Sequence, residues 1–87
     1  MIYELDGQLM TDRKSVHDHI KERLCLPDYY GKNLDALYDC LREMGEAEIV
    51  ICNYTEMTEK LERYAEALIK TFMDAAAANP GIQVRVE

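Results

Sequence analysis

The short apolar run Ala47–Cys52 constrains the fold more than any other stretch of the chain. Its β-branched residues are typical of a strand buried on both faces, as strands of a parallel sheet usually are. Segments with helical periodicity precede and follow it. Because a helix between two strands favours parallel pairing, we expect an α/β fold.

The two ends of the chain are expected to supply the other strands, Met1–Leu5 and Ile82–Val86. Residues 8–10 are expected to continue the first strand in extended form. Apolar residues at helical spacing predict three to four helices between the strands. The sequence therefore predicts a single domain over residues 1–87, with a three-stranded parallel sheet packed by these helices.

Capping residues predict where the helices begin. Thr11 or Asp12 is suited to cap the first helix, whose apolar face consists of Val16, Ile20 and Leu24. Asn53, followed by Glu56 three residues later, resembles a capping box. We expect Thr58 to begin a second helix after a short first one.

A loop followed by a helix is expected over residues 29–44. Asn33 is a good N-cap, and Gly45 is typical of a helix C-terminus. Asp35 and Asp39 are four residues apart and share one face, where like charges slightly destabilise a helix. The spacing alone is consistent with a solvated acidic face or with a recognition face for a positively charged partner. The opposite, apolar face consists of Leu34, Leu37, Leu41 and Met44.

Acidic residues outnumber basic ones by 17 to 10, which gives a net charge of −7. Such a surface repels free nucleic acid and attracts basic proteins, although simple solubility is an alternative reason for it. The chain begins Met1-Ile2-Tyr3-Glu4, so we expect no signal peptide, and no apolar run is long enough for a membrane span.

The cysteines Cys25, Cys40 and Cys52 have neither the spacing of a metal site nor that of a disulfide framework. Cys25 and Cys52 adjoin apolar runs and are expected to be small buried hydrophobic residues. Free cysteines of this kind are typical of a reducing compartment, so we expect the protein in the cytoplasm.

The sequence contains no arrangement that predicts catalysis. His17 and His19 are two residues apart on a helix and point in different directions. Asp35 and Asp39 could act as an acid–base pair or hold a divalent ion, but their neighbours Lys32 and Arg42 are cations. We therefore expect that the protein is not an enzyme and needs neither a cofactor nor a metal. An enzyme that uses the two aspartates is a weak alternative.

Residues 24–41, LCLPDYYGKNLDALYDCL, closely resemble the signature of the barstar family, intracellular inhibitors of a secreted ribonuclease. The length and element order of the rest of the chain also fit that family. The resemblance implies an inhibitor of a barnase-type ribonuclease that binds one-to-one, needs no cofactor, and contacts neither nucleic acid nor membrane.

The same resemblance implies roles for individual residues. Asp39 would take the place of an RNA phosphate, Asp35 would pair with a further arginine, and Tyr29 would stack near the catalytic histidine. We expect Tyr29 to point outward and Tyr30 inward. The implied partner-binding residues are Tyr29, Gly31, Asn33, Leu34, Asp35, Tyr38, Asp39 and Asp74.

The chain departs from the family pattern at four of these or neighbouring positions. Barstar has tryptophan where this chain has Tyr38 and Met44, an acidic residue at Lys32, and glutamate at Asp74. A second function therefore stays open, in which the same fold binds a different basic protein or toxin nuclease.

Overall fold

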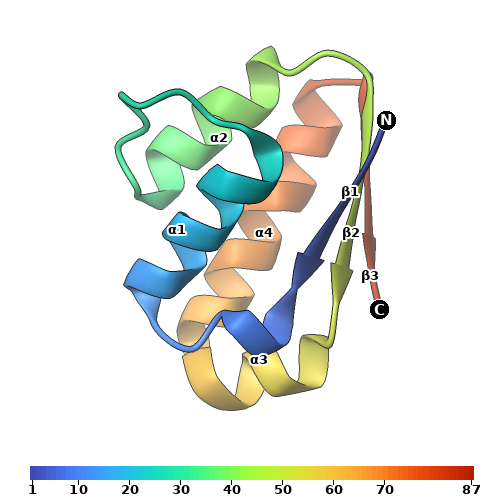
Figure 1. The fold of residues 1–87 in the computed structure, drawn as a ribbon. Helices are drawn as coiled ribbons and strands as arrows, with labels where there is room; N and C mark the ends of the chain where they lie inside the picture. Colours follow the sequence, from blue (N-terminus) through green and yellow to red (C-terminus); the bar gives the residue numbers. More distant parts are fainter.

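A computed structural model describes all residues, 1–87, and shows one sheet with helices packed against it (Figure 1). The strands β1 (Ile2–Asp6), β2 (Ala47–Cys52) and β3 (Ile82–Val86) lie in the order β1-β2-β3, and both neighbouring pairs are parallel. The predicted α/β fold with a three-stranded parallel sheet is confirmed.

Four α-helices connect the strands: α1 (Arg13–Leu24), α2 (Leu34–Glu43), α3 (Tyr54–Leu61) and α4 (Arg63–Ala78). None of them combines the length and the apolar character that crossing a membrane requires. The extended conformation expected for residues 8–10 is wrong, because the short 3₁₀ helix η1 (Gly7–Leu9) follows β1 directly. Asp6 stabilises this turn by accepting a hydrogen bond from the Gln8 N–H at 2.9 Å.

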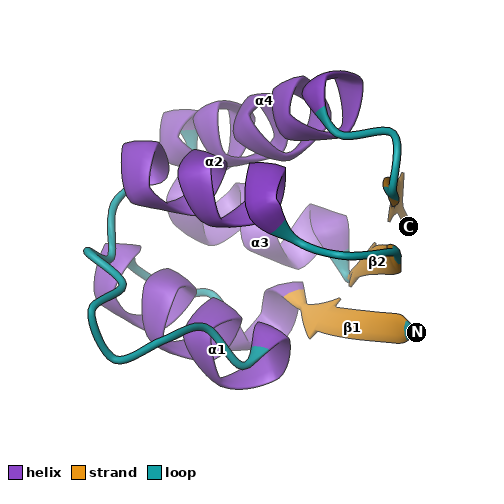
Figure 2. Cartoon of the chain, turned by 90° about the horizontal axis from the view of Figure 1, so that it is seen from above, coloured by secondary structure: helices purple, strands orange, loops and turns teal.

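All four helices lie on one face of the sheet (Figure 2). The expectation that β2 is covered on both faces is therefore wrong. Ile49 and Ile51 point toward the helices, whereas Val50 points to the open face. Val50 is still only 4% exposed, since the register places Glu4 and Arg85 on either side of it.

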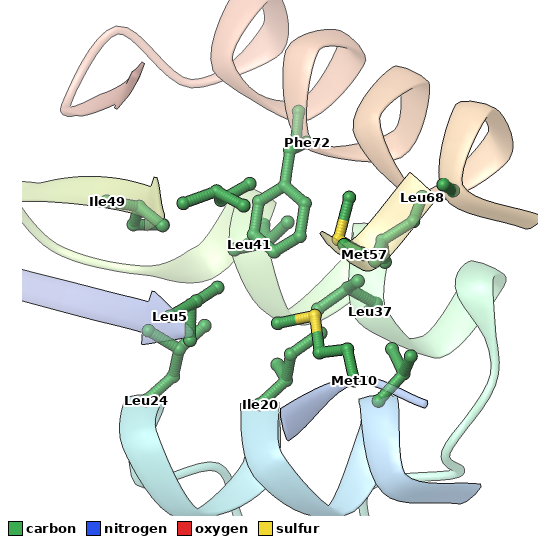
Figure 3. Close-up of a cluster of buried hydrophobic side chains, with 14 of the residues drawn as sticks. Leu5, Met10, Ile20, Leu24, Leu37, Leu41, Ile49, Met57, Leu68 and Phe72 are labelled. Carbon is green, nitrogen blue, oxygen red and sulfur yellow. The ribbon is translucent and has the colours of Figure 1, made fainter. Parts of the chain in front are cut away.

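The core lies between the sheet and the helices (Figure 3). Leu5 from β1, Ile20 from α1, Leu37 and Leu41 from α2, and Phe72 from α4 are all fully buried. The apolar face predicted for α1 is confirmed, and of the face predicted for α2 Leu37 and Leu41 are buried while Leu34 and Met44 are half-buried. Burying Leu37 and Leu41 fixes how α2 is rotated about its axis, and this rotation turns its opposite face to solvent.

A helix begins directly after Asn53, as predicted, but the expected capping box is absent and the second helix does not start at Thr58. Asn53 has a left-handed backbone (φ 56°) and makes no side-chain cap, because its amide donates to the Asp6 carboxylate at 2.8 Å. Thr58 lies inside α3, and its hydroxyl donates to the Tyr54 carbonyl oxygen within that helix at 2.8 Å. The helical conformation is interrupted instead at Glu62, between α3 and α4, where φ is 55°.

The expectations about the end of α2 and about the burial of two cysteines also differ from the structure. α2 ends at Glu43 with Met44 in extended backbone, so Gly45 is not a left-handed C-cap. Cys25 occupies the left-handed position after α1, with φ 55°. This position turns Cys25 outward, so it is exposed rather than buried, and Cys52 is only half-buried.

Candidate protein-binding site

A loop without regular secondary structure links α1 to α2 (Figure 1). It presents one tyrosine to solvent and buries the next. Tyr29 is 87% exposed, whereas Tyr30 is 5% exposed and belongs to the core. The Tyr30 N–H donates to the Pro27 carbonyl oxygen at 2.9 Å, which closes a turn around Tyr29. The predicted orientations of both tyrosines are confirmed.

The start of α2 is held by Asn33. The Ala36 N–H donates to its side-chain oxygen at 2.8 Å, as predicted for an N-cap, and its amide donates to the Gly31 carbonyl oxygen at 3.2 Å. A Cβ added at Gly31 would lie 3.3 Å from both the Ala36 Cβ and the Asn33 amide nitrogen. Gly31 and Asn33 therefore let the loop pass close to α2, and Asn33 acts within the fold.

The solvent face of α2 carries three carboxylates without a partner in the chain. Asp35 and Asp39 are exposed and form no ion pair or side-chain hydrogen bond, and the same holds for Glu43. Sequence reasoning missed Glu43, although it continues the four-residue spacing of the other two. The helix thus presents an unneutralised acidic stripe.

A hollow of about 420 Å³ lies between the loop and α2. Asp39 of the acidic stripe lies on its wall, together with Tyr29 and Gly31. Glu43 lines it as well, so two carboxylates face the same concave surface. The remaining wall is mostly apolar and consists of Leu24, Cys25, Leu26, Pro27, Tyr30, Ala36, Cys40 and Met44. A protruding side chain from a partner could enter this hollow and reach Asp39.

Leu34 and Tyr38 lie on the flank of α2 and are half-buried against the core. The Arg42 guanidinium lies 5.6 Å from the centre of the Tyr38 ring. Arg42 therefore stacks on Tyr38 and forms no ion pair with Asp39, which stays available.

Asp74 is not part of the hollow. It lies on α4, exposed, and its carboxylate accepts a hydrogen bond from Lys70 at 2.7 Å. This contact raises the pKa of Lys70. The charge of Asp74 is thus already paired within its own helix.

The cation next to the site, Lys32, is also paired. Its ammonium lies 2.8 Å from one oxygen of Asp18 on α1, and Lys14 lies 2.7 Å from the other oxygen. The hydrogen bonds from Lys14 and Lys32 lower the pKa of Asp18 to about 2. Lys32, at φ 54°, is thereby drawn toward α1.

The histidines form no metal site. His17 is buried and bonds to two tyrosine hydroxyls, and the His19 Nε2 accepts the Asp6 N–H at 2.9 Å. No group of three or more histidine, cysteine, aspartate or glutamate side chains is placed to hold a metal ion.

Comparison with known proteins identifies relatives of this chain. Residues 1–87 match the sequence profile of the family described as "Barstar (barnase inhibitor)". The chain belongs to the barstar family. It is also 34% identical over 73 residues to a Bacillus subtilis (strain 168) protein named "Putative ribonuclease inhibitor YrdF", with 82% of this chain and 80% of that protein covered. Both findings support ribonuclease inhibition as the general function.

Proposed function

We propose that this protein inhibits a barnase-type ribonuclease by filling its active site, one-to-one, with the loop and helix of residues 29–44. The observation that carries the proposal is the pair of exposed, unpaired carboxylates of Asp35 and Asp39 on a helix that Leu37 and Leu41 anchor in the core from its other face. A rigid helix holds both charges in place before the partner arrives.

The chemistry of a ribonuclease active site suits such a pair. An enzyme that binds RNA phosphates presents arginine, lysine and histidine side chains, and a carboxylate accepts several charge-assisted hydrogen bonds from such groups. In the proposal Asp39 replaces a phosphate at the centre of the enzyme site. Asp35 meets a further arginine, and the exposed ring of Tyr29 packs beside the catalytic residues.

The net charge of −7 supports fast association with a basic enzyme. Complementary charge raises the association rate more than the affinity, and physiological salt largely screens charges that are more than about 8–10 Å apart. The complex of barnase with its inhibitor is one of the systems on which this generalisation about association rates is based.

The test is an RNA-cleavage assay with a barnase-type ribonuclease and increasing amounts of the protein. Stoichiometric loss of cleavage at a one-to-one ratio, with association that slows as salt rises, is the expected result. The matched control is Glu59→Ala, which removes an exposed carboxylate from α3, far from the proposed contact. Undiminished RNA cleavage at excess inhibitor would contradict the proposal.

A different basic protein is the second candidate partner. Lys32 in the loop and Arg42 on the flank of α2 place cations beside the acidic stripe, and a partner whose acidic groups take Lys32 from Asp18 and meet Arg42 would fit them. Binding to a toxin nuclease without binding to a barnase-type enzyme would favour this candidate.

A further inference from the structure

His17 is the only polar or charged residue among the 21 buried residues of the chain. Its ring joins two parts of the fold that are distant in sequence. Nδ1 lies 2.5 Å from the hydroxyl of Tyr30 in the loop, and Nε2 lies 2.7 Å from the hydroxyl of Tyr64 on α4. The Arg13 guanidinium lies 4.6 Å above the Tyr64 ring and covers it.

The neutral form of histidine suits this arrangement. A neutral imidazole has one N–H donor and one acceptor nitrogen, and a hydroxyl can both donate and accept. One tyrosine therefore donates to the ring while the other accepts from it. No buried side-chain nitrogen or oxygen lacks a partner in the structure, so this chain of bonds is fully satisfied.

We propose that Tyr64 and His17 are positioning residues that hold Tyr30, and through it the loop, in the conformation that presents Tyr29 to a partner. This inference rests on the proposed function only where it says that a partner docks at Tyr29. The argument itself is geometric, because Tyr30 lies between the outward Tyr29 and Gly31. The buried ring of Tyr30 can leave its site only by breaking the bond to His17.

A second contact ties the same loop to the same helix, but at the surface. Lys32 reaches Asp18, the residue after His17, and both side chains are more than a third exposed. Exposed ion pairs contribute little to stability and are screened by salt, whereas a buried polar group left without a partner is costly. The buried bond therefore restrains the loop more strongly than this exposed ion pair does.

A restrained loop has a consequence for binding. A loop that is already in its bound conformation loses less conformational entropy when a partner docks. Tyr64 does not line the hollow, yet it holds the His17 ring at the nitrogen opposite the one that bonds to Tyr30. Its hydroxyl would act on the loop from a distance.

The test measures amide hydrogen exchange of the free protein. We expect Tyr30→Phe to accelerate exchange of the Tyr30 amide at least about fivefold, because one lost buried partner has this effect or more. Tyr64→Phe should accelerate the same amide less, and the double variant should equal Tyr30→Phe alone, since both act on one chain of bonds. Tyr54→Phe removes a hydroxyl with no hydrogen bond in the structure and is the matched control.

The readout separates positioning from general stability. Positioning predicts faster exchange only in residues 28–33, with the amides of β2 and α4 unchanged. Faster exchange spread over the whole chain, additive effects of the two variants, or no effect of Tyr64→Phe would overturn the inference.

A binding arm keeps the inference distinct from the proposed function. A barnase-type ribonuclease should protect the Tyr30 amide in the parent and in Tyr64→Phe alike. Failure of the parent to bind would overturn the proposed function, while the exchange of the free protein would still decide the role of Tyr64.

Discussion

The aspartates of α1 and α2 carry the same charge, but in the structure they differ in whether a cation pairs with them. On α1, Asp18 is bound by two lysines, Lys14 and Lys32, at less than 3 Å. On α2, Asp35 and Asp39 have no partner. The chain therefore pairs the exposed carboxylate of α1, and leaves carboxylates unpaired on the helix proposed to meet another protein.

Substituting the central aspartate of each helix tests this contrast most strongly. Asp39→Ala should weaken ribonuclease binding by at least about 30-fold, the lower limit for an interface hot spot, because the enzyme's cations lose their anion. Asp18→Ala should weaken it by less than about threefold, as expected for an exposed ion pair. Calorimetric titration measures both. Comparable losses for the two variants would remove the distinction between the helices.

A second test compares a free carboxylate with a paired one near the proposed interface. Asp35→Ala should cost about tenfold in affinity, and Asp74→Ala less, since Lys70 already shares the charge of Asp74. Surface plasmon resonance at two salt concentrations measures these differences. A larger loss for Asp74→Ala than for Asp35→Ala would mean that the Lys70 pair opens on binding.

Removing the cation beside the site should have a smaller effect of the opposite sign. Lys32→Gln keeps a Cβ at the left-handed position and so leaves the backbone cost unchanged. Loss of the positive charge should speed association with a basic enzyme by about twofold to fivefold at low salt. Stopped-flow fluorescence measures the rate. Slower association would indicate that the partner offers an acidic group to Lys32.

The smallest expected effect is a pH dependence of stability. Burial lowers the pKa of His17 and of His19 below the ordinary 6.5, with a smaller opposing contribution from Asp18 at His17 and from Asp6 at His19. Because the unfolded state binds these protons first, stability should be complete above pH 6.5 and decline as the pH falls below it.

The ion pairs of α1 should not contribute to that decline, because the pKa of Asp18 is about 2 and its carboxylate stays charged. Its own contribution disappears only as the pH falls below the usual 3.8. The groups that face His17 are Tyr30, Tyr64, Asp18, Lys32 and, over the Tyr64 ring, Arg13. Urea unfolding between pH 7.5 and pH 5 measures the slope, and a rise in stability toward pH 5 would contradict the assignment.

Local signals in the sequence predicted much of this fold. The spacing of Leu37 and Leu41 predicted the buried face of α2, and Asn33 predicted its start. The failures involve residues that compete over long sequence distances. Asn53 has the chemistry of a cap, but Asp6 takes its amide. Val50 resembles a residue under a helix, but its neighbours across the sheet shield it.

In the candidate site, too, sequence predicts the local features but not the contacts between residues distant in the chain. Asp35 and Asp39 were found from their spacing, and that spacing also contained Glu43. The pairing of Lys70 with Asp74 is a local helical contact that sequence can suggest. The capture of Lys32 by Asp18 joins residues 14 positions apart, and only the folded loop brings them together.

Calorimetric titration of a barnase-type ribonuclease with the parent protein and with Asp39→Ala tests the central claim most directly. The account predicts tight one-to-one binding by the parent and a loss of at least about 30-fold in the variant, with the same melting temperature for both proteins. Equal affinity of the two proteins, or a large drop in melting temperature for Asp39→Ala, would contradict it.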